Sequence, residues 1–189
     1  MASRLLTMIC CVLALAGCSP SAVVSPGERV AAATAIDAEY RLGVGDRVKM
    51  NVFNEAALSG EFAVNDSGNI SLPLIGDIPA TGKTPAEVAR VVETRLADGY
   101  LREPKVSMEV AAYRPFYILG EVKSPGQYPY ASGLTVLNAI ATAQGFTPRA
   151  EKKVVFIRKF GTDVEEPFKL TPDLKVYPGD TIRLGERFF

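Results

Sequence analysis

The chain has 189 residues, with 21 basic and 21 acidic side chains, and therefore no formal net charge. A chain without excess positive charge lacks the attraction that nucleic acid requires, so we expect no nucleic-acid partner. Histidine is absent, which excludes the catalytic groups and metal sites that depend on imidazole. Hydrophobic residues make up 48% and charged residues 22%, a globular composition that suits one or two small domains.

The first 17 residues have the pattern of a secretory signal peptide. The basic residue Arg4 precedes an apolar run, Leu5 to Ala16, that is too short to span a bilayer comfortably. The stretch ends Leu15-Ala16-Gly17-Cys18, which resembles the lipobox of bacterial lipoproteins. We therefore expect cleavage between Gly17 and Cys18 and a covalent lipid on the Cys18 sulfur. The alternative is an ordinary secretory signal followed by a chance cysteine.

The cysteine count supports the lipid. Cys10 and Cys11 would leave with the signal peptide, so one thiol remains and no internal disulfide is possible. Ser19, rather than Asp, follows Cys18, which favours an outer-membrane anchor facing the periplasm. Residues 18–38 are rich in Ser, Pro, Ala, Val and Thr and are expected to form a flexible tether. Apart from the lipid, no cofactor or metal is expected.

Residues 39–113 contain the elements of a first small domain. Val48, Met50 and Val52 alternate with polar residues, as in a half-buried strand. The segment Asn65–Asn69 separates two apolar runs and predicts a hairpin turn that joins them.

A helix and a strand follow in the same domain. Thr84-Pro85-Ala86-Glu87 is the sequence of a capping box, which predicts a helix that Gly99 ends. Its apolar face would be Val88, Val91, Val92 and Leu96, and the next strand would point Val106, Met108 and Val110 one way.

Tyr113-Arg114-Pro115 marks a boundary, because proline moves the preceding residue out of helical geometry. In residues 114–189 we expect a strand over Phe116–Glu121, a type II turn over Ser124–Gln127 and a returning strand at Tyr128–Tyr130. A helix over Leu134–Ala143 with Gly145 at C′ would follow, and then strands at 154–158, 164–170 and 181–184. This order suits one helix laid across a mixed sheet, as in a β-grasp fold, so the chain is predicted to be α+β.

Two Gly-Asp pairs precede similar strands. Gly45-Asp46 and Gly179-Asp180 each come before an alternating segment, which indicates recurrent turn chemistry rather than duplication.

Motifs for catalysis are weak. The segment Gly76 to Thr84 is similar to a phosphate-binding loop, but five residues separate Gly76 from Gly82 where that motif needs four, and Pro79 removes an amide. We interpret it as a loop leading into the capped helix. Acidic residues that a glycosidase could use are expected to be solvated surface charges: Glu55, Glu61, Asp66, Glu121, Glu165 and Glu166.

Several motifs in order resemble one family. Tyr40 to Asp46, Asp66 to Gly76, Gly82-Lys83-Thr84 and Pro104-Lys105-Val106 are similar to the polysaccharide export domain of outer-membrane capsule and exopolysaccharide exporters. Gly120 to Tyr128, followed by Leu134 to Ile140, is similar to the soluble ligand-binding β-grasp (SLBB) domain of the same proteins. Gln144-Gly145 stands where the family often shows two glycines.

The resemblance implies a small mixed α/β polysaccharide-export domain (39–113) followed by a β-grasp SLBB domain (114–189). It also implies a ring of identical subunits that conducts polysaccharide, docked on an inner-membrane polysaccharide co-polymerase, without catalysis. Longer members carry a C-terminal helix that lines the outer-membrane pore, and no such helix is expected in this sequence. We therefore expect a separate outer-membrane β-barrel as a further partner. The alternatives are a monomeric periplasmic glycan-binding adaptor and a glycan-processing enzyme. Motif residues expected to serve fold and assembly are Gly45, Asp46, Asp66, Gly68, Pro73, Gly76, Gly82, Thr84, Gly120, Pro125 and Gly126.

Overall fold

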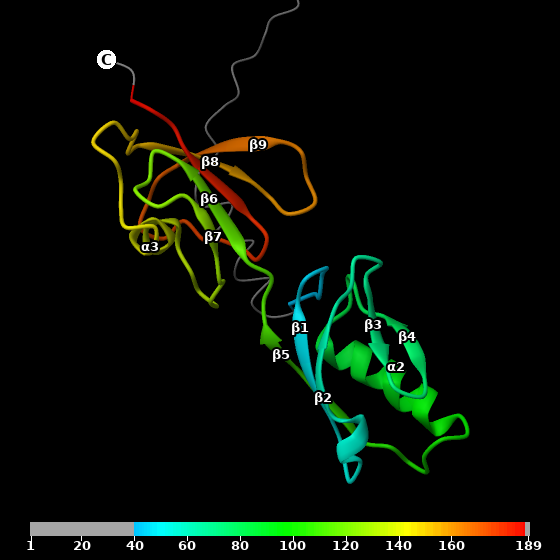
Figure 1. The fold of residues 1–189 in the computed structure, drawn as a ribbon. Helices are drawn as coiled ribbons and strands as arrows, with labels where there is room; N and C mark the ends of the chain where they lie inside the picture. The colour runs from blue at the N-terminus through cyan, green and yellow to red at the C-terminus, as the bar shows by residue number, and fades with distance from the viewer. Residues whose placement is uncertain (1–39, 188–189) are drawn as a thin grey trace, which may run out of the picture.

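The computed structural model describes residues 40–187. The predictions for the signal peptide, for Gly17 and Cys18 and for the tether lie outside the described residues. The described part forms two domains, each with its own hydrophobic core, that lie end to end and are joined where β5 (Val106–Ala112) passes into β6 (Phe116–Gly120) (Figure 1). The predicted α+β class is confirmed.

The first domain is built on a three-stranded antiparallel sheet. Strand β1 (Arg47–Val52) lies between β2 (Gly60–Ala63) and β5. Its residues alternate between exposed and buried, and the buried positions are Val48, Met50 and Val52, as predicted. A short 3₁₀ helix, η1 (Ala56–Leu58), connects β1 to β2.

Helix α2 (Pro85–Ala97) packs against β5 and begins with the predicted capping box. The Thr84 hydroxyl accepts a hydrogen bond from the Glu87 amide, and the Thr84 amide donates to the Glu87 carboxylate at 2.7 Å. This hydrogen bond from the Thr84 amide lowers the pKa of the Glu87 carboxyl. The helix buries Val88, Val92 and Leu96 and leaves Val91 half-buried.

The predicted hairpin across Asn65–Asn69 is wrong, because β2 and β3 (Asn69–Leu72) belong to different sheets. Strand β3 pairs instead with β4 (Gly76–Pro79). The Asn65 side chain accepts hydrogen bonds from two amides within the turn, at Ser67 and Asn69, and so closes the turn on itself. Strand β4 also corrects the interpretation of residues 76–84 as a loop, since their first four residues form this strand.

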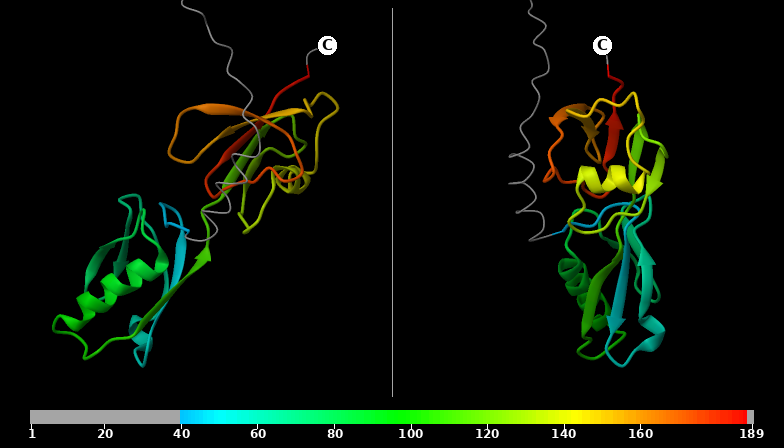
Figure 2. Two further views of the ribbon diagram at one scale, coloured as in Figure 1. Left: turned by 180° about the vertical axis from the view of Figure 1, so that it is seen from behind. Right: turned by 90° about the vertical axis from the view of Figure 1, so that its left-hand side faces the viewer.

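The second domain is a five-stranded mixed sheet in the order β7-β6-β10-β8-β9. Strands β6 and β10 (Thr181–Leu184) are parallel, and the other pairings are antiparallel. Helix α3 (Val136–Thr142) packs into the core on one face of the sheet (Figure 2). The remaining strands are β7 (Gly126–Tyr128), β8 (Val154–Arg158) and β9 (Glu165–Lys169). The predicted order of elements is therefore confirmed.

Two local predictions in this domain are wrong. Gly126 does not have the positive φ that a type II turn needs; it begins β7 and pairs with Ile118. The positive φ lies at Gly120 (φ +88°), where a Cβ would come within 2.0 Å of the Leu184 carbonyl oxygen. At the end of α3, Gln144 (φ 64°) rather than Gly145 follows the C-cap residue Ala143.

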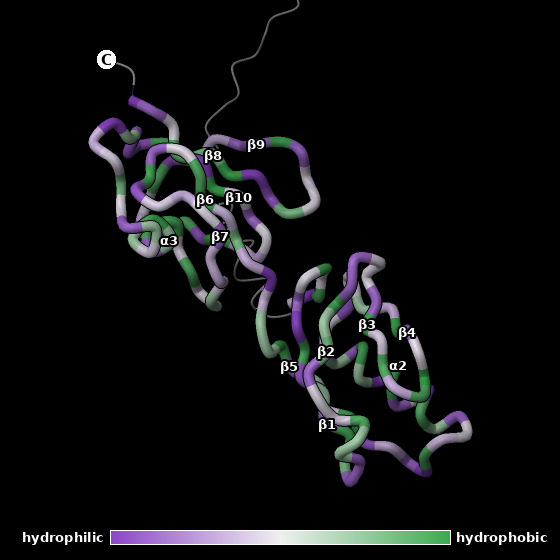
Figure 3. The backbone as a smooth tube through the Cα atoms, in the orientation of Figure 1, coloured by the Kyte–Doolittle hydropathy of each residue, from purple (hydrophilic) through white to green (hydrophobic). Residues whose placement is uncertain are grey.

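Figure 3 shows a hydrophilic stretch where the chain crosses from the first domain to the second. Within residues 40–187, every helix is too short or too polar to cross a membrane.

Candidate functional site

The two domains meet at a buried ion pair between Asp46 and Arg114. Asp46 precedes β1 and is fully buried, and Arg114 lies between β5 and β6 with its side chain 14% exposed. Arg114 Nη1 donates to Asp46 Oδ2 at 3.0 Å, and the Arg114 amide donates to Asp46 Oδ1 at 2.8 Å. We call the surrounding cluster the junction; its members are Tyr40, Asp46, Tyr113, Arg114, Tyr130 and Pro178.

Further donors complete the hydrogen bonding of the Asp46 carboxylate. The Tyr40 hydroxyl donates to Asp46 Oδ2 at 2.7 Å and accepts from Arg114 Nη1 at 3.1 Å, while the Gly43 amide donates to Asp46 Oδ2 at 2.7 Å. Burial, together with the adjacent Asp46 carboxylate, raises the pKa of the Tyr40 phenol, so Tyr40 stays protonated and remains a donor to a higher pH than an exposed tyrosine does. A buried ion pair is tolerated when such additional bonds satisfy it, and this one is well satisfied.

Arg114 also holds the second domain. Its Nε donates to the Pro178 carbonyl oxygen at 3.1 Å, and the Gly179 amide donates to the Pro115 carbonyl oxygen at 3.1 Å. The guanidinium carbon lies 4.2 Å from the centre of the Phe160 ring, a cation–π contact. One side chain therefore binds a carboxylate in the first domain and a carbonyl and an aromatic ring in the second.

A chain of tyrosines makes a second connection across the junction. The Tyr40 and Tyr113 rings meet edge to face with centroids 4.8 Å apart, and Tyr113 meets Tyr130 of the second domain at 5.3 Å. Edge-to-face pairs of this kind are favourable and directional. Two separate sets of contacts thus restrain rotation of one domain against the other.

Of the predicted motif residues, Asp46 belongs to the junction and Gly45 adjoins it. A Cβ on Gly45 would lie 3.5 Å from the Arg114 Cβ. The other predicted residues lie elsewhere. In the first domain they occupy turns, strand ends and the cap of α2: Asp66, Gly68, Pro73, Gly76, Gly82 and Thr84. In the second they lie at the end of β6 and the start of β7: Gly120, Pro125 and Gly126.

The sequence does not identify Arg114 as the residue that joins the two domains. The Tyr113-Arg114-Pro115 segment indicated a boundary only through the backbone effect of proline. The one local signal for its role is its position at the predicted boundary, between Tyr113 and Pro115. Its acceptors, Asp46 and Pro178, lie 68 and 64 positions away in the chain, so no local pattern connects them.

Several of the acidic candidates for catalysis are occupied in ion pairs. Glu165 accepts hydrogen bonds from Arg183, which lower the pKa of the Glu165 carboxyl, and Glu166 lies 2.8 Å from Lys159 Nζ. In the described part of the chain, no three His, Cys, Asp or Glu side chains are grouped to hold a metal ion.

Two family models match the chain in sequence order, and their matches meet at the junction. The model for polysaccharide biosynthesis/export proteins matches residues 34–111, and the SLBB domain model matches residues 115–167. The chain belongs to the polysaccharide export family. Its second domain is an SLBB domain of that family.

Two curated proteins named for polysaccharide production or transport are similar to this chain. It is 41% identical over 134 residues to the exopolysaccharide production protein ExoF of Rhizobium meliloti (strain 1021), an alignment that covers 65% of this chain and 32% of ExoF. It is 25% identical over 159 residues to the polysialic acid transport protein KpsD of Escherichia coli, covering 79% of this chain and 28% of KpsD. The chain therefore spans about a third of the length of these relatives.

Proposed function

We propose that this protein is a subunit of an envelope apparatus that exports polysaccharide, and that it contributes to the conduit rather than to catalysis. The observation that carries the proposal is that an export match and an SLBB match follow each other in one chain. Arg114, in the short gap between them, pairs with Asp46 of the first domain and so holds the two domains together. The names of the relatives, an exopolysaccharide production protein and a polysialic acid transport protein, support polysaccharide as the cargo.

In this proposal several copies form a ring around a hydrated passage. A ring closes only when each subunit repeats the same rotation toward its neighbour. A free hinge between two domains would let that rotation vary, whereas the junction restrains it. Weak contacts with the passing chain suffice, because a polymer that is bound tightly does not move.

The proposal places the ring at the outer membrane, on its periplasmic side, held by the lipid on Cys18. Each buried acyl methylene contributes about 0.8 kcal/mol to membrane binding, so two or more acyl chains anchor a protein firmly. The proposed partners are an inner-membrane polysaccharide co-polymerase and a separate outer-membrane component.

Deleting the gene tests this function. Without the protein, we expect polymer to accumulate inside the cell envelope and secretion to fall, and the wild-type gene should restore secretion. Cys18→Ala should restore it poorly because the anchor is lost. Arg114→Ala should also restore it poorly, while Arg102→Ala, which removes an exposed arginine of the first domain, should restore it fully. Normal secretion by the deletion strain would refute the proposal.

Two measurements on purified protein test the mechanism. Native mass spectrometry of the delipidated protein should give a ring of many copies; a persistent monomer that still binds polymer would instead indicate an adaptor. Prolonged incubation with the exported polymer should leave its chain length unchanged, and shortened product would indicate a glycan-processing enzyme.

A further inference from the structure

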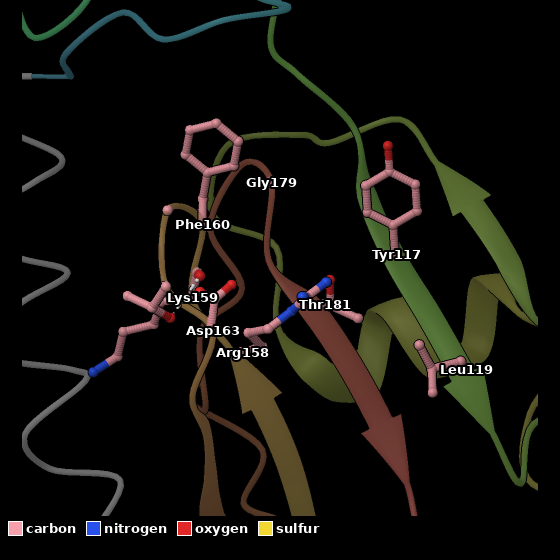
Figure 4. Close-up of a pocket in the computed structure, with 10 residues that line it drawn as sticks. Tyr117, Leu119, Arg158, Lys159, Phe160, Asp163, Gly179 and Thr181 are labelled. Atoms are coloured by element: carbon pink, nitrogen blue, oxygen red, sulfur yellow. Dashed lines mark hydrogen bonds between the residues drawn. The ribbon is translucent and has the colours of Figure 1, made fainter.

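A cavity of about 590 Å³ opens beside the junction on the second domain (Figure 4). It lies on the face of the sheet that points away from α3, which we call the open face. The cavity is lined by Tyr117 of β6, Arg158 of β8, Thr181 of β10, and Phe160 and Asp163 of the β8–β9 connection, among others.

Two aromatic rings stand on opposite sides of this cavity, with Arg158 and Thr181 between them (Figure 4). Tyr117 is 41% exposed and Phe160 is 50% exposed. Large apolar rings that remain exposed around a hollow are typical of binding sites.

Phe160 is held in place rather than free to turn away. The Arg114 guanidinium packs on its ring at 4.2 Å, and Gly179 lies directly beneath it. A Cβ on Gly179 would come within 2.5 Å of Phe160 Cδ2, so glycine is required for this close packing. The junction therefore fixes one wall of the cavity.

The floor and rim of the cavity carry exposed polar groups that a ligand could contact. Arg158 Nη2 donates to the Thr181 hydroxyl at 3.3 Å, which leaves other N–H groups of the guanidinium for a ligand. Across residues 40–187, the Tyr117 hydroxyl and the Asp163 carboxylate have no hydrogen-bond partner. A planar donor, a carboxylate acceptor and two ring faces thus surround one space.

A sugar ring has the matching chemistry. Its C–H faces are apolar and pack on aromatic rings, and each hydroxyl on its edge both donates and accepts a hydrogen bond. From this geometry we propose that the cavity is a binding subsite for saccharide, with Tyr117 and Phe160 contacting the ring faces and Arg158 and Asp163 contacting the hydroxyls. That its natural occupant is the exported polymer rests on the function proposed above.

A second cavity, of about 580 Å³, lies further along the same face. Phe156 and Arg183 line it, and Phe156 pairs with Arg183 as Arg158 pairs with Thr181, so all four side chains point away from α3. The Arg183 guanidinium carbon packs 4.2 Å from the Phe156 ring centre, and Arg183 is paired with Glu165. Two successive shallow hollows suit a chain of repeating units better than a single small molecule.

Saturation-transfer NMR on the purified full-length protein tests the subsite. The probe is a mixture of oligosaccharides released by partial acid hydrolysis of the polymer that the source cells secrete. Wild-type protein should give saturable transfer with a dissociation constant in the millimolar range, because the site is open and weak binding permits transport.

Variants locate the binding. Tyr117→Ala and Arg158→Gln should each weaken binding by about fivefold or more, the effect of losing one ring contact or one charged donor. Tyr100→Ala is the matched control, since Tyr100 is also an exposed tyrosine (52%) but lies in the first domain, and binding by this variant should equal that of wild type.

The subsite is refuted if wild-type protein shows no saturable transfer, or if Tyr117→Ala and Arg158→Gln bind as wild type does. If these variants lose the oligomer but keep saccharide binding, the open face is an interface between copies and the subsite is likewise refuted. Secretion by the deletion strain separates the two proposals. If the purified protein does not bind the oligosaccharides but the wild-type gene restores secretion, only the subsite is refuted. If the deletion strain secretes normally, the proposed function itself is refuted.

Discussion

The two Gly-Asp turns of this protein have the same local structure in two different domains. Gly45 and Gly179 have φ angles of +88° and +85°. Each aspartate amide donates to the carbonyl three residues earlier at 3.1 Å, on Gly43 and Tyr177 respectively. Each aspartate Oδ2 accepts from the amide of that same earlier residue, at 2.7 Å for Asp46 and 3.0 Å for Asp180.

The turns differ in what they offer to Arg114. The first provides the Asp46 carboxylate, while the second provides the Pro178 carbonyl oxygen and the glycine on which Phe160 rests. The same short motif therefore supplies a side-chain acceptor in one domain and a backbone acceptor in the other. A local pattern therefore determines the conformation of the turn, whereas the long-range partner determines its role.

The largest difference between the turns should appear on removing each carboxylate. Asp46→Ala leaves Arg114 without its ion-pair partner and should lower the free energy of unfolding by about 3–5 kcal/mol. Asp180→Ala removes the acceptor of the Tyr177 amide and should cost about 1–3 kcal/mol. Denaturant unfolding followed by circular dichroism measures both. Equal losses of unfolding free energy in the two variants would mean that the ion pair with Arg114 contributes no stability at the first turn.

The Tyr40 hydroxyl makes the stability of the first turn depend on pH. Because burial raises the pKa of Tyr40 above its ordinary value of 10.0, its stabilising effect is complete below that pH and is lost as pH rises through the raised pKa. Tyr40→Phe should cost about 1.5–3 kcal/mol at neutral pH, since it removes a hydrogen bond to a charged group. Thermal unfolding should be measured for wild type and Tyr40→Phe from about pH 8 to about pH 11. The difference in stability between these two proteins should narrow above the ordinary phenol pKa. A constant difference across this range would contradict the assignment.

The smallest effects concern backbone conformation alone. Gln144 adopts a left-handed φ of 64° at the end of α3, so Gln144→Gly should raise stability by about 1 kcal/mol. Gly45→Ala should lower it by about 1–2 kcal/mol, because alanine is strained at φ +88°. Calorimetric melting of both variants measures these changes in stability. A loss of stability in Gln144→Gly would show that the glutamine side chain has a role of its own.

Local patterns predicted the elements that are stabilised by neighbours in sequence. The capping box of α2 needs only residues 84–87, and the alternation of β1 shows in six consecutive residues. Strand β4 escaped prediction because Gly76 and Pro79 argue against a strand, yet pairing with β3 and the burial of Ile78 stabilise it. The predicted hairpin failed for the same reason: a turn sequence indicates that the chain bends, not which strand it then joins.

From the amino-acid sequence alone follow the α+β class, the order of elements in the second domain and the positions of the two Gly-Asp turns. Each depends on contacts within a few residues or on the alternation of apolar side chains, and such signals are continuous in the chain. The tertiary structure alone brings Arg114 to Asp46 and Pro178, seats Phe160 against Gly179 and places two exposed rings around one cavity. These contacts join residues that are far apart in sequence, and their geometry arises only when both domains have folded and met.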